Sequence, residues 1–230
     1  MNKVAIMQPT YLPWSGYFGL INSVDTFVFL DSVQFAKRSW QQRNQIKSQN
    51  GPQWLTVPVL TKGKRDQLIM DAIINNEDNF RNKHIKSIES NYSKSNFFKT
   101  EAKPLFEKIK CNYKTLSLQN MELINYLCER LSIKTTLLKS SDLNYFGSKS
   151  DLLASICLEV NASEYISPPG SKIYLDFSNA FSKINIPVRY FEYSHPVYNQ
   201  LWGEFIPNMS IIDMLFNCGD ESINLIKTTS

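Results

Sequence analysis

Cysteine and histidine are scarce in this sequence and nowhere clustered. The 230 residues include four cysteines and two histidines, and no two cysteines form a CxxC pair. Structural zinc sites need close groups of these residues, and disulfide-stabilised domains need a much denser set of cysteines. The sequence therefore predicts neither a metal site nor a disulfide framework. It predicts buried free thiols and identifies no cofactor.

A strong charge of one sign and a long apolar run are also absent. Lys and Arg number 25 against 21 Asp and Glu, a net charge of +4. This balance does not favour a nucleic-acid partner, although basic residues gather around 37–47 and 62–65 and leave a local phosphate site open. No stretch reaches the ~20 apolar residues of a membrane span, and the N-terminus has no signal-peptide pattern. We expect a cytoplasmic protein.

What the sequence does contain is alternation of strand and helix patterns. An apolar run at residues 4–7, an amphipathic stretch at 14–21 and a second run at 26–31 indicate strand, helix and strand. Residues 54–59 and 67–74 are predicted to pair as a β-hairpin. Helical spacing then extends from residue 79 to about 130. We expect one α/β domain over residues 1–230, with residues 54–130 as a possible inserted lobe of hairpin and helices.

The alternation resumes in the second half of the chain. Strands are predicted at 135–139, 164–167 and 188–193, with helices at 148–160 and 174–183 between them, and Ser148 or Ser150 as the cap of the first. Two further helices, at 210–217 and 221–226, follow. This order predicts a mostly parallel, Rossmann-like sheet with right-handed crossovers.

Polar side chains follow the first two predicted strands. Gln8 comes after the first and Asp31 after the second, and ligands of open α/β sheets bind at the carboxyl ends of the strands. Asp31 could position an amine or a ribose hydroxyl, or it could cap a turn. The polar cluster behind it supplies candidate substrate-binding residues: Gln34, Lys37, Arg38 and Arg43. The arginines suit a phosphate or carboxylate if they converge, and a solvated face otherwise.

A second candidate region is the segment at residues 194–208, which follows the last predicted strand. It mixes prolines, a glycine, aromatics and polar groups, as a structured binding loop does. His195 is a candidate general base, or a histidine that only hydrogen-bonds the loop. Glu204 has apolar neighbours and is a second candidate base, or an anchoring carboxylate. Asn208 is a candidate substrate-binding residue.

Aromatic residues are frequent in the same regions. Tyr11 and Trp14, in the loop after the first strand, are candidate substrate-binding residues. Tryptophan and tyrosine side chains more often pack within the protein than provide a stacking surface for a ligand. We therefore expect packing for Trp40 and Trp54.

Four stretches together resemble the WbqC-like protein family: QPTYLPWSGYF, FVFLDSVQFAKRSWQQRNQIK, QWLTVPV and SHPVYNQLWGEFIPNMSIIDMLFNCG. The motifs are long and unusual, and they extend nearly from end to end. The resemblance implies a place among proteins of bacterial O-antigen and other surface-polysaccharide (lipopolysaccharide) clusters, with a glycine transferase role suggested for one relative. The turn at residues 167–172 is poorer in glycine than the resemblance implies, so it is a weak candidate for a phosphate loop.

The first strand-loop-helix unit also resembles that of nucleotidyltransferase-like α/β proteins. Trp14-Ser15-Gly16-Tyr17 stands at the place of their H-x-G-H signature, whose histidines contact a triphosphate. Trp14 and Tyr17 cannot supply an imidazolium there. The resemblance implies a shared fold, with adenylyl-transfer chemistry absent or altered.

These observations lead to one main hypothesis and two rivals. The main hypothesis is a transferase that adds a glycyl or other acyl group to an amino sugar, as its nucleotide-linked form, in surface-glycan synthesis. Its partners are then small molecules, a nucleotide sugar and an acyl donor; the donor could be a thioester, an acyl-adenylate or an aminoacyl-tRNA. The rivals are ATP-dependent nucleotidyl transfer or activation, and a non-catalytic sugar-nucleotide-binding module. The oligomeric state stays open.

Overall fold

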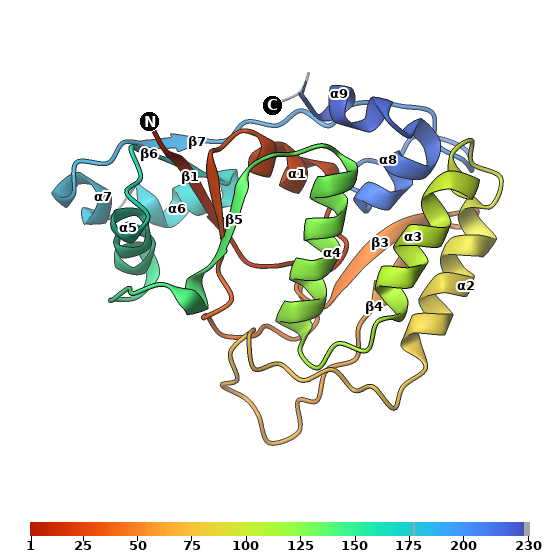
Figure 1. Ribbon diagram of the computed structural model, residues 1–230, viewed down its shortest axis with the longest axis horizontal. Helices are drawn as coiled ribbons and strands as arrows, with labels where there is room; N and C mark the ends of the chain where they lie inside the picture. Colours follow the sequence, from red (N-terminus) through yellow and green to blue (C-terminus); the bar gives the residue numbers. More distant parts are fainter. Residues whose placement is uncertain (177, 228–230) are drawn as a thin grey trace.

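The fold, described here from a computed structural model for residues 1–176 and 178–227, is a mixed α/β architecture around a parallel sheet (Figure 1). The sheet contains β1 (Lys3–Met7), β2 (Thr26–Phe29), β5 (Thr136–Lys139), β6 (Glu164–Ser167) and β7 (Val188–Tyr190). Its spatial order is β5-β2-β1-β6-β7, and every pairing is parallel. This confirms the Rossmann-like α/β prediction.

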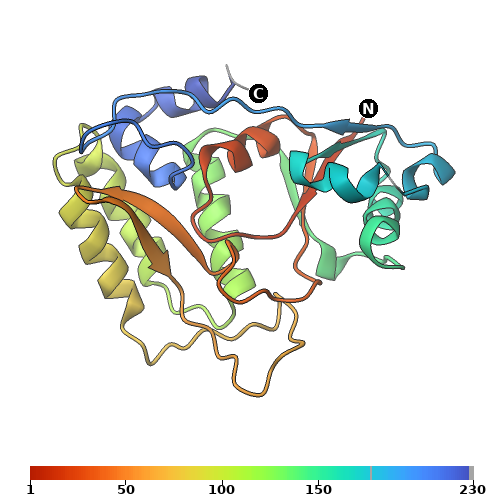
Figure 2. The same cartoon turned by 180° about the vertical axis from the view of Figure 1, so that it is seen from behind.

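Both faces of the sheet are covered by helices. The helices are α1 (Ser15–Asn22), α2 (Phe80–Tyr92), α3 (Phe98–Lys110), α4 (Leu116–Arg130), α5 (Lys149–Glu159), α6 (Lys172–Leu175), α7 (Ala180–Lys183), α8 (Ile211–Cys218) and α9 (Glu221–Lys227), with 3-10 turns η1 (Ser140–Asp142) and η2 (Pro169–Ser171). Helices α5 to α7 lie at one end of the molecule and α2 to α4 at the other, as both views show (Figures 1 and 2). None of the described helices is long and apolar enough to cross a membrane.

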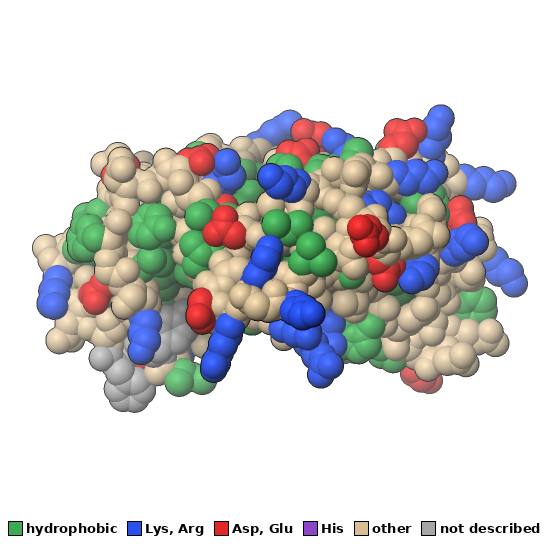
Figure 3. Space-filling view, turned by 90° about the horizontal axis from the view of Figure 1, so that it is seen from below, with side chains coloured by type: hydrophobic (Ala, Val, Ile, Leu, Met, Phe, Trp, Pro, Cys, Tyr) green, Lys and Arg blue, Asp and Glu red, His purple; other side chains and the backbone are tan. Residues whose placement is uncertain are grey.

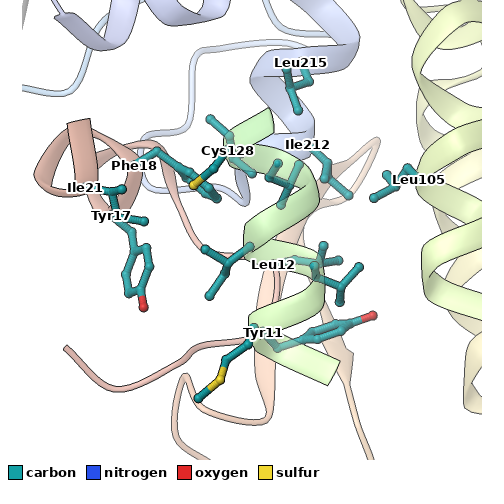
Figure 4. Packing of buried hydrophobic residues seen from close by; sticks show 14 of the residues in the cluster. Tyr11, Leu12, Tyr17, Phe18, Ile21, Leu105, Cys128, Ile212 and Leu215 are labelled. Carbon is teal, nitrogen blue, oxygen red and sulfur yellow. The ribbon is translucent and has the colours of Figure 1, made fainter. Parts of the chain in front are cut away.

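Successive strand residues face two different cores, as the period of two in a strand requires. Ala5, Phe27 and Phe29 belong to a large core with α1, α4 and α8, whereas Val4 and Val28 belong to a smaller core with α5 and α7. Side chains of the larger core pack around α4 and the start of α1 (Figure 4). Continuous apolar runs in these strands follow from burial on both faces.

The chain between β2 and β5 folds differently from the hairpin prediction. β3 (Arg43–Ser48) pairs antiparallel with β4 (Gly51–Thr56), so β4 has β3 as its partner. Residues 67–74 form no regular strand and contribute only isolated bridges, such as Ile74 with Val59. The predicted pairing of 54–59 with 67–74 is therefore wrong. The sequence of β3 is rich in polar residues, so the segment was not recognised as a strand or as the partner of β4. The inward side chains of β3, Asn44 and Lys47, are buried and hydrogen-bonded to backbone carbonyls.

Two smaller predictions also need comment. The helix expected at 174–183 includes residue 177, which lies outside the described residues; on either side the chain forms α6 and α7. Ser148 is the N-cap of α5, as expected, but its side chain makes no capping hydrogen bond. Cys128 and Cys157 are buried free thiols, whereas Cys111 is exposed because it follows the last residue of α3 at the surface.

Candidate functional site

A cleft of about 1030 Å³ lies at the carboxyl edge of the parallel sheet. Numbered along the chain, the five strands have the order 3-2-1-4-5, so the chain reverses direction across the sheet between β1 and β6. Ligands of such sheets bind in the crevice at this reversal. The cleft opens there: its walls include Met7 and Gln8 after β1, Leu30 and Ser32 after β2, and Pro168 after β6.

One wall of the cleft is apolar. Leu152 and Leu153 of α5 contribute to it together with Tyr165 of β6, and Leu68 closes the other side. The polar part is fixed by amide side chains: Gln41 Nε2 donates a hydrogen bond of 2.8 Å to Gln8 Oε1. This hydrogen bond orients the Gln8 side chain within the cleft lining.

Basic residues gather at the rim. Gln34 Nε2 donates to the Arg65 carbonyl at 3.1 Å and to Asp66 at 3.3 Å, so the loop at residues 61–66 lies against the cleft wall. Lys62, Lys64 and Arg65 of this loop are exposed. Lys and Arg side chains cross the middle of the face seen from below, beside exposed apolar side chains (Figure 3). The basic loop at residues 61–66 is thus held next to Gln34, a residue that lines the cleft.

Lys37 and Arg38 belong to the same rim. Both are exposed and directly precede Ser39 and Trp40, which line the cleft. The Arg38 backbone has φ of 61° and donates its N–H to Gln42 Oε1 at 2.9 Å, which fixes this turn. Gln34 therefore lines the cleft, whereas Lys37 and Arg38 are exposed residues next to its lining segment.

The beginning of α5 forms the opposite side of the opening. Gly147, Ser148 and Lys149 line the cleft, and Gly147 has φ of +81°, where a side chain would be strained. A helix N-terminus carries a partial positive charge. The Lys149 side chain adds a cation at this end of the helix, and Asp151 adds a carboxylate in the first turn.

An aromatic pair beside the cleft was missed by the sequence reasoning, which favoured packing. Trp40 lines the cleft and is 51% exposed; Trp54 is 41% exposed, and the two rings lie 5.3 Å apart. The Arg43 guanidinium lies over the Trp54 ring at 4.1 Å. Arg43 is therefore linked to the cleft only through its contact with Trp54. No contact between Arg43 and Arg38, or with a shared partner, is seen among the described residues. Composition alone carries no signal for this exposure.

Asp31 and Tyr11 are withdrawn from the cleft. Asp31 is 2% exposed, and its carboxylate accepts hydrogen bonds from the Ser140 hydroxyl and from the Ser141 backbone N–H and hydroxyl. It thus holds the 3-10 turn η1, which lies more than 100 residues later in the chain, rather than the turn that directly follows β2. Tyr11 is completely buried; its hydroxyl and His84 Nδ1 share a hydrogen bond of 2.8 Å. Burial raises the pKa of Tyr11 well above its usual value and lowers that of His84 to about 4.

His195 and Trp14 lie in a different place, at the start of α1. His195 Nε2 and the buried Ser15 hydroxyl are 3.2 Å apart, and Nδ1 lies 3.0 Å from the Pro196 carbonyl. The imidazole stacks on Trp14 and on Tyr198. Burial lowers the pKa of His195, so it is neutral at pH 7. Neither His195 nor Trp14 is among the described residues that line the cleft.

Glu204 and Asn208 are exposed and also stand apart from the cleft-lining residues. What anchors the loop at 194–208 is a buried network below it. Lys47 Nζ donates to the Glu204 carbonyl, while the Asp213 carboxylate accepts from the Tyr92 hydroxyl at 2.7 Å and the Tyr198 hydroxyl at 2.8 Å. Sequence reasoning missed Lys47 and Asp213 as a buried group, because their packing together depends on β3.

The predicted site residues therefore fall into separate groups. Gln8, Gln34, Lys37, Arg38 and Arg43 surround or border the cleft. The others lie in the core or along the 194–208 loop: Tyr11, Trp14, Asp31, His195, Glu204 and Asn208. Within the part of the chain that the structure describes, no three His, Cys, Asp or Glu side chains form a group that could hold a metal ion.

The fold defines the chain as a Rossmann-like α/β protein, with a cleft at the carboxyl edge of its parallel sheet. Its family is given by comparison with known proteins: a model of the WbqC-like protein family matches residues 8–225, so the chain belongs to this family. It is 39% identical over 231 residues to an uncharacterized protein of Mycobacterium tuberculosis, covering 99% of this chain and 98% of that protein. No solved structure matches.

Proposed function

We propose that the protein is a transferase that binds a nucleotide-linked amino sugar in the strand-end cleft and adds a glycyl or other acyl group to its amine, in surface-glycan synthesis. The observation that carries the binding part is the combination of an apolar wall and a basic rim at the reversal point of the sheet. The glycan setting rests on the family resemblance of the sequence motifs.

The two sides of the cleft suit the two ends of a nucleoside diphosphate. A nucleobase packs on apolar side chains, and Leu152 and Leu153 of α5 contribute to the apolar wall. A diphosphate needs cations and backbone N–H groups, which Lys149, the start of α5 and the rim lysines and arginines provide. A volume of about 1030 Å³ is at the upper end for small-molecule sites and accommodates a nucleotide sugar.

The transfer itself is a direct attack. The amine nitrogen of the sugar forms a bond to the acyl carbonyl carbon, the donor's leaving group departs with its electron pair, and the nitrogen gives up one proton to a base. His195 has the neutral imidazole that such a base requires, but its Nε2 faces Ser15 rather than the cleft. Base roles for His195 and Glu204, and an amine-positioning role for Asp31, stay predictions, and the donor class stays open.

The rival reading, adenylyl transfer from ATP, requires phosphate contacts at the start of α1. There the Trp14 indole lies over Gly16 so closely that a Cβ added to Gly16 would come within 2.2 Å of it. This packing favours a structural role for the Trp14-Ser15-Gly16-Tyr17 turn. A sugar-nucleotide-binding module without turnover is the remaining alternative.

A thermal-shift screen of the purified protein tests the proposal. The ligands are UDP- and dTDP-linked sugars, ATP with magnesium, and acyl-CoAs. A ligand at about 100 times its Kd stabilises the folded state by roughly 2.7 kcal/mol. We expect stabilisation by the nucleotide sugars. Stabilisation by ATP alone would favour activation chemistry, and a protein that none of them stabilises would contradict the proposal.

A further inference from the structure

Two tryptophan side chains that contact each other at the surface leave a continuous apolar area exposed to water. Trp40 and Trp54 are 51% and 41% exposed, and their ring centroids lie 5.3 Å apart at a tilt of 42°. Adjacent exposed aromatic area of this kind marks ligand or partner sites. The pair is contiguous with the cleft, because Trp40 is one of its lining residues.

The pair is held in place by β3 and β4. Trp54 is paired with Gln45, and Arg43 with Thr56, so Arg43 and Trp54 are diagonal neighbours on adjacent strands. The Arg43 guanidinium carbon lies 4.1 Å from the Trp54 ring centroid, a cation–π contact. The backbone of Trp40 is held by the loop after β1, since its carbonyl accepts a hydrogen bond of 3.1 Å from the Tyr11 N–H. We call Trp40, Trp54 and Arg43 the tryptophan platform.

The position of the platform indicates which part of a ligand reaches it. The nucleoside end belongs at the sheet reversal between β1 and β6, where Tyr165, Leu152 and Leu153 lie. Trp40 lines the same cleft together with Ser39 and Gln41, and the Gln41 side chain hydrogen-bonds to Gln8 after the end of β1. A ligand whose base lies beside β6 and that extends past Gln8 presents its other end to Trp40.

We propose that the tryptophan platform binds the sugar ring of the nucleotide-linked sugar, which rests on the proposed function of the cleft. The C–H bonds on one face of a pyranose pack on the electron-rich face of an indole. The hydroxyl groups of the sugar can stay hydrated at the same time, because Trp40 is exposed to solvent. The Arg43 guanidinium, which no side-chain carboxylate among the described residues pairs with, supplies donors for the sugar's hydroxyl or carboxylate groups. The platform thus selects for the sugar, while the cleft selects for the nucleotide.

Calorimetric titration of the full chain tests this assignment. The probes are UDP-N-acetylglucosamine, UDP-glucuronate and dTDP-glucose, each measured beside UDP or dTDP. We expect at least one sugar-linked probe to bind about tenfold more tightly than its diphosphate. Trp40→Ala removes this difference and leaves diphosphate binding within twofold of the parent, while Trp40→Phe retains most of it. Phe97→Ala, at another exposed aromatic side chain that is outside the cleft lining, is the control and changes neither affinity.

The outcomes separate the two proposals. Binding of no probe and no diphosphate overturns the proposed function itself. Equal binding of diphosphates and sugar-linked probes by the parent protein overturns the platform assignment alone. Loss of diphosphate and sugar-linked binding by the same factor in Trp40→Ala also overturns it, because the ring would then contact the nucleobase or diphosphate. The far-UV circular dichroism of each variant confirms that it is folded.

Discussion

The cleft rim and the network under the loop at residues 194–208 both contain charged side chains, but these differ in burial and in pairing. Lys62, Lys64 and Arg65 at the rim are exposed, and no acidic side chain among the described residues forms an ion pair with them. Under the loop, Lys47 and Asp213 are buried and each has hydrogen-bond partners within the protein. Polar groups that the protein itself satisfies hold its fold, whereas unpaired groups at a cavity are the ones a ligand can use.

The largest effect is expected from breaking the network under the loop. Asp213→Ala removes a fully buried carboxylate that accepts from Tyr92, Tyr198 and Gln200. Deletion of one partner in such a buried charged group costs about 3–5 kcal/mol. We expect a loss of this size in the free energy of unfolding, measured with urea.

The control is Asp220→Ala. Asp220 also accepts from a cation, Arg130, at 2.7 Å, but its side chain is 90% exposed, so the expected loss is below about 1 kcal/mol. Similar losses of stability in both variants would contradict the view that the buried polar groups under the loop contribute more to stability than exposed ion pairs do.

His195 gives an intermediate test, because it was a candidate base and is found in the anchored loop. We expect His195→Gln to cost about 1 kcal/mol in stability through its hydrogen bond with Ser15, with nucleotide-sugar binding unchanged. Retained stability with complete loss of acyl transfer would instead assign it a catalytic role.

The pH dependence of stability provides a second readout for the same residue. Burial lowers the pKa of His195 below its ordinary value of about 6.5, so the unfolded chain binds the proton first as pH falls. Its contribution is complete above pH 6.5 and is lost as pH falls through the lowered pKa. His84, with a pKa of about 4, acts in the same direction. We expect His195→Gln to flatten, but not abolish, the fall in stability between pH 6.5 and 4, followed by thermal unfolding.

The sequence predicts the parallel sheet well because its signals are local. Val4, Phe27 and their neighbours form apolar runs, and the helices between them have regular spacing. β3 escapes prediction because its inward residues, Asn44 and Lys47, are polar, and only their distant carbonyl partners make burial possible. Tertiary contacts override local composition there.

The candidate site residues also differ in whether local sequence or long-range contacts decide their positions. Gln8, predicted from its place after the first strand, and Gln34, predicted from the polar segment after the second, both line the cleft, and their role in binding stays a prediction. Asp31 was also predicted from its place after a strand, yet Ser140 and Ser141, more than 100 residues later in the chain, take both its oxygens. The exposure of Trp40 likewise depends on how the β3–β4 hairpin packs. Which strand-end residue stays available to a ligand is thus decided by long-range contacts.

The smallest effect, and the most specific, is expected at the rim. The double variant Lys64→Glu/Arg65→Glu reverses two exposed charges beside the cleft, so stability should change by less than about 0.5 kcal/mol. Binding of UDP should weaken by about tenfold at low ionic strength, and the difference from the parent should shrink as salt rises, because exposed charges are screened. Lys99→Glu/Lys103→Glu on α3, two exposed charges outside the cleft lining, controls for net charge and should leave UDP binding unchanged. Equal weakening in both double variants would assign the effect to the overall charge of the protein and leave the rim without a specific role.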